Sequence, residues 1–161
     1  MPKLSVLSEI QRKSMLMWPC IEHDDTPWTP MVKPLSQSKV ALVTTAGLHV
    51  RGDKPFIAEH TKGGDTSYRT IPRSAGAADI IQSHTSLGFD HTGIYRDVNV
   101  TFPIDRLQEL VDQKIIGSLS YNYYSFMGAL RDVTGIIEES GPEVARRLKD
   151  EGVDVVLLTP T

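Results

Sequence analysis

Strand-like and helix-like segments alternate along the second half of the chain, and this alternation restricts the fold more than any other feature. Residues 103–111 begin with a proline and place apolar side chains on one helical face, and residues 141–152 repeat this pattern and end in a glycine. Apolar runs at residues 39–45, 115–120 and 153–159 read as strands. We therefore expect an α/β fold with an open, mainly parallel, doubly wound sheet of the Rossmann or flavodoxin type and right-handed crossovers.

The strand expected at residues 153–159 comes at the end of the sequence, without a following loop and helix. In open α/β sheets, ligands bind at the carboxyl ends of the strands. We therefore expect the chain to be the N-terminal part of a larger sheet. We also expect self-association into a homo-oligomer that covers the exposed edge of this last strand.

Two regions precede the regular α/β pattern. Residues 1–37 place Trp beside Pro twice, which disfavours long helices and predicts an irregular arm laid over the domain or over a partner subunit. A lid over a site is the alternative for this arm. Residues 38–161 are expected to form the α/β domain. Up to about residue 101, this domain carries a long passage rich in Gly, His, Asp, Arg and Thr, which favours a functional role.

Composition excludes several classes of protein. The 161 residues are 40% hydrophobic and 23% charged, as expected for one domain with a core. A formal net charge of -3 and the lack of a basic cluster argue against nucleic-acid binding. No signal peptide and no run near the ~18 apolar residues of a membrane span are present, so we expect a cytoplasmic protein that does not bind membranes. Cys20 is the one cysteine, which excludes an intrachain disulfide and a zinc site built on thiolates.

Common cofactor and nucleophile motifs are missing. The five histidines show no paired metal-ligand spacing, and we expect no metal site; they are His23, His49, His60, His84 and His91. The loops that contain Ala46-Gly47 and residues 61–65 lack the spacing of dinucleotide-binding or phosphate-binding loops. No serine lies in a nucleophile-elbow motif.

The densest set of polar side chains lies between residues 65 and 99. Arg69 suits a carboxylate ligand, because its planar guanidinium can donate two parallel hydrogen bonds. His84 or His91 could move a proton near neutral pH. Each residue also has a structural alternative. Arg69 could form an ion pair with Asp65 or Asp97, and His84 could be a hydrogen-bonded core residue.

Five runs along nearly the whole chain carry a family resemblance: residues 40–49, 64–72, 97–110, 126–128 and 148–159. In order and content they resemble the selenoprotein B family of glycine, sarcosine, betaine and D-proline reductases. Pro27-Trp28-Thr29-Pro30 resembles the N-terminal arm of the D-proline reductase branch.

The resemblance implies reductive cleavage of the α carbon–nitrogen bond in a small amino acid or derivative of the glycine, sarcosine, betaine or proline class. It implies a selenocysteine or cysteine just beyond Thr161, where helix N-terminal donors lower the pKa of the reactive group. It also implies a partner subunit that carries a pyruvoyl group and a thioredoxin-like electron donor. Within the 161 residues themselves we expect no cofactor.

Under this interpretation, His84 and Asp97 are the candidate catalytic residues. His84 would protonate the leaving amine, and Asp97 with Asn99 would orient the substrate or support His84. Arg69 would bind the substrate carboxylate. The candidate substrate-binding residues are Thr44, Thr45, His49, Arg69 and Asn99.

Two other classes remain open at this point. A noncatalytic carboxylate-binding or assembly subunit with the same fold is the main alternative. A racemase or lyase on a related sheet is a third reading, which one cysteine disfavours. Whether the chain is itself an enzyme stays open, because it lacks the reactive selenol or thiol of the family.

Overall fold

The computed structural model describes residues 3–17, 22, 24–56, 64–85 and 91–161. Cys20, His23 and His60 lie outside these residues, as does most of the loop at 61–65. The chain divides into two compact units, Met1–Pro30 and Met31–Thr161.

The first unit contains a helix that the sequence did not predict. After a 3-10 turn η1 (Leu4–Val6), helix α1 (Glu9–Leu16) begins at Ser8, whose side chain accepts a hydrogen bond from the Gln11 backbone. The Gln11 side chain accepts one from the Ser8 backbone in return, so the pair forms a capping box. This box stabilises the start of a short helix, and the expectation of a wholly irregular segment is wrong here.

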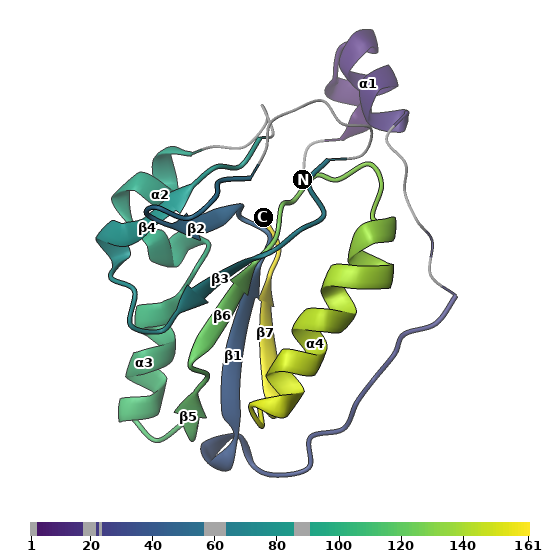
Figure 1. Cartoon of the computed structure of the whole chain (residues 1–161). Helices are drawn as coiled ribbons and strands as arrows, with labels where there is room; N and C mark the ends of the chain where they lie inside the picture. Colours follow the sequence, from purple (N-terminus) through teal and green to yellow (C-terminus); the bar gives the residue numbers. More distant parts are fainter. Residues whose placement is uncertain (1–2, 18–21, 23, 57–63, 86–90) are drawn as a thin grey trace. The chain divides into compact units, whose positions relative to one another are not determined.

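A five-stranded sheet organises the second unit around β1 (Lys39–Thr44) (Figure 1). The strands β5 (Ser118–Leu119) and β6 (Asn122–Ser125) pair one after the other with one side of β1. β7 (Val155–Thr159) also pairs with β1, in register over its whole length. All three of these strands run parallel to β1.

The remaining strand of this sheet, β3 (Arg69–Pro72), runs antiparallel to β6. The α/β class is therefore confirmed, but the sheet is mixed and is not a purely parallel Rossmann or flavodoxin-like sheet. The antiparallel pairing brings Arg69 opposite Ser125, so the polar passage contributes a strand to the main sheet. This strand has no clear apolar pattern in the sequence, because only Ile71 of its four residues is buried.

The polar passage also builds a small layer of its own. β2 (Leu48–Val50) and β4 (Ile80–Gln82) form a two-stranded antiparallel sheet. The 3-10 turn η3 (Ala77–Asp79) leads into β4, and helix α2 (Thr92–Arg96) and the 3-10 turn η4 (Val98–Val100) follow it.

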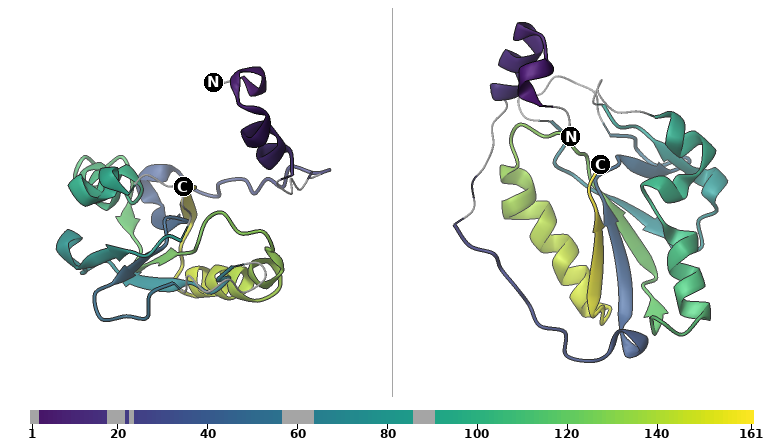
Figure 2. Two further views of the ribbon diagram at one scale, coloured as in Figure 1. Left: turned by 90° about the horizontal axis from the view of Figure 1, so that it is seen from above. Right: turned by 180° about the vertical axis from the view of Figure 1, so that it is seen from behind.

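The two longest helices cover opposite faces of the main sheet (Figure 2). α3 (Ile104–Asp112) places Leu107 in a core cluster with Val40 and Leu42. α4 (Gly141–Asp150), which continues a π-helical segment η5 (Ile136–Ser140), places Leu148 in a second cluster with Ala41. Because successive strand residues point to opposite faces, the two clusters and their helices lie on opposite sides of β1.

The sequence located both of these helices and the last strand, but it placed the middle strand too early. Pairing starts at Ser118, breaks after Leu119 and resumes at Asn122. The residues before Ser118 turn out of α3, with Lys114 at a φ of 59°. Gly117 packs so closely that an added Cβ would lie 2.8 Å from the backbone of Gln37. Ile115 and Ile116 are not part of the strand, because their backbone N–H groups still donate to the Leu110 carbonyl of α3, at 2.9 and 3.3 Å.

Candidate functional site

Threonines join the carboxyl ends of β1 and β7. The Oγ1 atom of Thr44 lies 3.1 Å from the carbonyl oxygen of Thr101 and 3.2 Å from that of Thr159. The hydroxyl of Thr159 donates to the same Thr101 carbonyl at 2.9 Å. One residue further along, the Thr161 backbone N–H donates to Thr45 Oγ1 at 2.8 Å. These bonds fix the edge of the sheet at which open α/β folds hold their ligands.

The His84 side chain lies close to this edge of the sheet, beside Gly128. The imidazole is buried, with 7% of the residue exposed. A Cβ added to Gly128 would lie 3.0 Å from His84 Nε2, 3.1 Å from the Thr45 carbonyl oxygen and 2.6 Å from the Thr161 carbonyl oxygen. Gly128 therefore allows three segments far apart in the sequence to approach one point: the ends of β1 and β7, and the segment after β4.

The surroundings of His84 favour its neutral form. Burial lowers the pKa of His84 below its ordinary value of 6.5, and the nearby His91 lowers this pKa further. His91 itself contacts Gln82, with 2.7 Å between Nδ1 and Oε1, and the Gln82 amide donates to the Ala46 carbonyl at 3.1 Å. A neutral imidazole at this edge can accept a proton near neutral pH.

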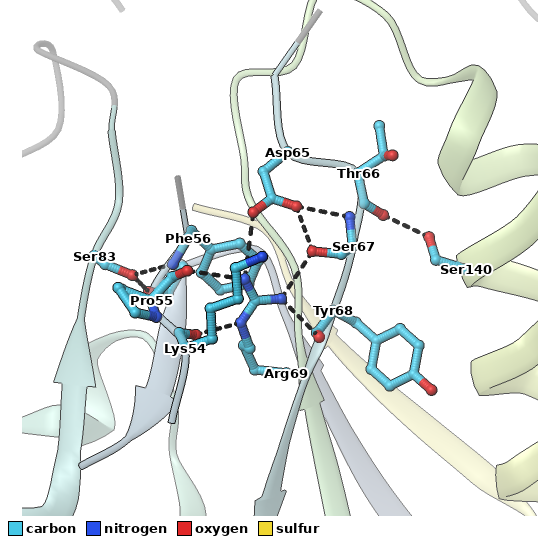
Figure 3. Close-up of polar contacts among 11 residues, drawn as sticks. Lys54, Pro55, Phe56, Asp65, Thr66, Ser67, Tyr68, Arg69, Ser83 and Ser140 are labelled. Atoms are coloured by element: carbon cyan, nitrogen blue, oxygen red, sulfur yellow. Dashed lines mark hydrogen bonds and ion pairs between the residues drawn. The ribbon is translucent and has the colours of Figure 1, made fainter. Parts of the chain in front are cut away.

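Arg69 lies inside a clamp that joins β3 to the loop at Lys54–Phe56 (Figure 3). Its Nε donates to the Lys54 carbonyl at 2.6 Å, and one terminal nitrogen donates to the Pro55 carbonyl at 3.0 Å. The guanidinium also lies over the Phe56 ring, 4.2 Å from its centroid. Cation–π contact and carbonyl acceptors thus hold the loop against the strand.

The remaining donors of Arg69 point toward its own strand and the turn before it (Figure 3). The other terminal nitrogen donates to Ser67 Oγ at 2.8 Å and to the Tyr68 carbonyl at 2.9 Å, and Asp65 accepts an ion-paired bond at 3.3 Å. Each of the five guanidinium N–H groups thus has an acceptor within the chain. For Arg69 to bind a substrate carboxylate, at least one of these bonds must be exchanged, and that role stays a prediction.

Asp97 and Asn99 form a turn in front of α3. The Asp97 carboxylate accepts hydrogen bonds from the side chain and backbone of Asn99, and these bonds lower the pKa of the Asp97 carboxyl. Asn99 in turn donates to Asp105 at 2.8 Å and accepts from its backbone N–H at 3.0 Å. These contacts link the pair to the first turn of α3, and the proposed support of His84 by Asp97 stays a prediction.

His49 lies in the small sheet. It is buried on β2 opposite Ile81, and its Nδ1 lies 3.0 Å from the Val50 carbonyl oxygen. The structure therefore places Thr44, Thr45 and His84 at the carboxyl edge, and it places His49, Arg69 and the Asp97–Asn99 turn in structural contacts of their own.

Four residues at this edge were not among the predicted site residues: Thr101, Gly128, Thr159 and Thr161. Gly128 carries a signal that the sequence offers, because a glycine closely follows the strand at Asn122–Ser125. The hydrogen bonds between the threonines have no such signal in the sequence, since one spans a separation of 57 positions and another a separation of 115. Among the residues that the structure describes, no group of three His, Cys, Asp or Glu side chains could hold a metal ion.

The fold and this edge define a class: an α/β protein in which β1, β7 and a buried histidine meet at the carboxyl ends of the strands. The chain belongs to the glycine/sarcosine/betaine reductase selenoprotein B (GRDB) family, whose model matches residues 11–161. The resemblance carried by the sequence runs is thereby confirmed.

Among its relatives, D-proline reductase subunit gamma of Acetoanaerobium sticklandii is 44% identical over 132 residues, which are 82% of this chain and 52% of the relative. Sarcosine reductase complex component B subunit beta of Peptoclostridium acidaminophilum is 30% identical over 146 residues, 89% of this chain and 33% of the relative. A glycine reductase complex component B subunit gamma, of Symbiobacterium thermophilum, is 30% identical over 144 residues, again 89% of this chain and 33% of the relative. The chain thus spans about half of the first relative and about a third of the other two.

No solved structure matches the chain significantly. The relatives themselves are named as subunits of a reductase or of reductase complexes. Within the described residues, no helix has the length and apolar character needed to cross a membrane.

Proposed function

We propose that the chain forms part of a reductase component that removes the amine from the α carbon of a small amino acid or derivative. The observation that supports this proposal best is the meeting of His84, Thr45 and Thr161 at Gly128. The edge combines a buried base with the carboxyl ends of two parallel strands, where α/β folds hold small ligands.

In this proposal the reactive group is a selenol or thiol that follows Thr161, and it supplies the nucleophile for the cleavage. The lowered pKa of His84 keeps its imidazole neutral, so His84 would take the proton of the selenol or thiol at Nε2. It would pass that proton to the amine nitrogen as the α carbon exchanges its bond to nitrogen for one to selenium or sulfur, and the proposed thioredoxin-like donor would then supply the two electrons that release the product. This order describes one way in which His84 would protonate the leaving amine.

The threonines would fix the geometry of this step. Thr44 and Thr159 both bond to the Thr101 carbonyl, and Thr45 holds Thr161 through its backbone. Held in this way, the end of β7 keeps a constant position relative to His84 while the substrate exchanges. A pyruvoyl-bearing subunit and a thioredoxin-like donor remain the proposed partners, and the substrate is of the glycine, sarcosine, betaine or proline class.

The test uses the full-length natural protein assembled with its partner subunits. The His84→Gln variant is expected to lower kcat for reduction of the accepted substrate at least tenfold, since acid–base groups contribute about 10²–10⁴-fold. The matched control is Gln113→Ala, an exposed change at the end of α3 that should keep full activity. An unchanged kcat in His84→Gln would remove this residue from the mechanism. No reduction of D-proline, glycine, sarcosine or betaine by the wild-type complex would overturn the function itself.

A noncatalytic assembly subunit is a second candidate, and one observation favours it. The Arg69 donors are all engaged within the chain, so the residue best suited to a carboxylate is already held in a structural role. An assembly subunit would bind its partners with unchanged affinity when His84 is replaced. Activity and partner binding, measured on the same variant, therefore separate the two functions.

A further inference from the structure

β7 has an open edge. It pairs with β1 along Val155–Thr159, and in the described part of the chain no strand pairs with its other side. Three consecutive apolar residues of β7 are exposed: Val156 by 38%, Leu157 by 39% and Leu158 by 67%. Exposed apolar edge strands of this kind are normally covered in stable proteins.

An apolar groove of about 500 Å³ adjoins this edge. One wall is α4, and the floor comes from β1, β7 and Phe126, the residue that follows β6. Figure 1 shows how these elements are arranged. The apolar side chains of the groove include Val43, Phe126, Val144, Leu148, Val156 and Leu158. The groove lies on the same sheet face as α4, so one more element would fit between this helix and the open strand.

The direction of the chain indicates which element fits. From β1 the chain crosses on the α3 face to β5 and β6, and from there it crosses on the α4 face to β7, on the other side of β1. In a right-handed crossover, the direction in which the chain moves across the sheet decides which face its helix covers, and the opposite direction places the helix on the opposite face. A further strand added at the open edge of β7 would continue in the same direction as the crossover from β6 to β7. Its helix would therefore lie on the α4 face, where the groove is.

We propose that the open edge of β7 and this groove bind a further helix–strand unit of a reductase component. The strand pairs parallel to β7, and the helix lies beside α4 with an apolar stripe over Val156 and Leu158. The source is the part of the component B polypeptide outside the region shared with this chain, since the matched region is 52% of one relative and 33% of two others. This inference rests on the family membership and names a partner for the proposed function.

The probe is the portion of the Acetoanaerobium sticklandii D-proline reductase subunit gamma that lies outside its matched region. It is co-expressed with this chain, so that neither part has to fold alone, and the amount co-purified with tagged chain is measured. The wild-type chain should retain the probe in a 1:1 complex by light scattering. Leu158→Glu should reduce the retained probe at least tenfold, because it places a charge in an apolar contact.

Ile137→Glu is the matched control, since Ile137 is 64% exposed but does not line the groove. This variant should retain the probe as the wild type does, and circular dichroism should show both variants folded. A probe that stays insoluble or unbound beside the wild-type chain would overturn the proposal. The proposal would also be overturned if Leu158→Glu retained as much probe as the wild type. It would equally be overturned if the wild-type chain formed a homodimer that Leu158→Glu dissociates, with the probe unbound.

A second measurement does not depend on this variant and tests the proposal even if Leu158→Glu does not fold. Hydrogen exchange on the wild-type complex should show the amides of Val155–Thr159 and the groove side of α4 slowed relative to the chain alone. Unchanged exchange there would contradict the docking site. Because neither measurement uses activity, binding without reduction would contradict the proposed function and leave this inference intact, and reduction without binding would do the reverse.

Discussion

The Thr45 hydroxyl forms hydrogen bonds with both the backbone N–H and the carbonyl oxygen of Thr161. The Thr45 hydroxyl accepts from the Thr161 N–H at 2.8 Å and donates to the Thr161 carbonyl at 3.3 Å. One side chain of β1 thus holds the residue just past β7, at the point where His84 and Gly128 also meet.

Replacing this side chain tests the tie. Thr45→Val keeps the shape of the residue but loses both hydrogen bonds, so the free energy of unfolding should fall by about 1 kcal/mol. Chemical denaturation measures this change. Thr29→Val, an exposed change in the first unit, is the control and should stay within about 0.5 kcal/mol of wild type. Equal stability of Thr45→Val and wild type would mean that the tie contributes nothing.

Gly128→Ala should disturb the contact between His84 and the end of β7. Its Cβ would come within 2.6 Å of the Thr161 carbonyl oxygen, which forces a shift costing about 1–3 kcal/mol. The imidazole resonances of His84 should move in the NMR spectrum. Gly93→Ala in α2 is the control, since its Cβ would meet only the Val100 side chain, at an ordinary contact distance of 3.7 Å. Unmoved His84 resonances in Gly128→Ala would show that the glycine does not position the histidine.

The lowered pKa of His84 predicts how stability depends on pH. Below the ordinary pKa of 6.5, the unfolded chain binds a proton at this residue more readily than the folded chain does. His84 therefore favours folding fully above about pH 6.5, and this contribution is lost as the pH falls through its folded pKa. Unfolding of wild type and His84→Gln over this range should show a steeper loss for wild type.

A titration by NMR checks the cause directly. The pKa of His84 should lie below 6.5, and His91→Gln should raise it, because the second contribution to the shift is the charge of His91. A His84 pKa at or above 6.5 would contradict the argument that burial favours its neutral form.

Arg69→Lys should destabilise the chain by about 1–3 kcal/mol, because lysine cannot reproduce the planar set of donors that holds Lys54–Phe56. Thermal unfolding of the chain measures this loss. The predicted carboxylate role adds a separate expectation in the assembled reductase, where KM should rise more than kcat falls. A lower melting temperature with an unchanged KM would assign Arg69 to the clamp alone.

The sequence predicted the elements that have a regular period of their own. The helical period at Ile104–Asp112 and Gly141–Asp150 and the apolar run at Val155–Thr159 all correspond to elements of the structure. The pairing of β2 with β4 was not predictable in this way, because it joins Leu48 to Gln82 across a polar passage with no period.

The candidate site shows the same limit. Strand ends could be located from the sequence, so Thr44 and Thr45 were predicted at the sheet edge and lie there. The setting of Arg69 depends on the carbonyl oxygens of Lys54 and Pro55, which any residue type supplies. A guanidinium in a clamp and one in a binding site therefore look alike until the loop is placed.

The pairing of β1 with β7 has a consequence for the timing of folding. The Lys39 backbone N–H donates to Asp154, a residue 115 positions later in the sequence. The central strand β1 is therefore synthesised long before its neighbour β7. At about 5–20 residues per second on the ribosome, β1 waits on the order of ten seconds for this neighbour. During that interval its side toward β7 is open to other strands, and a chaperone or a partner subunit would have its longest opportunity to act there.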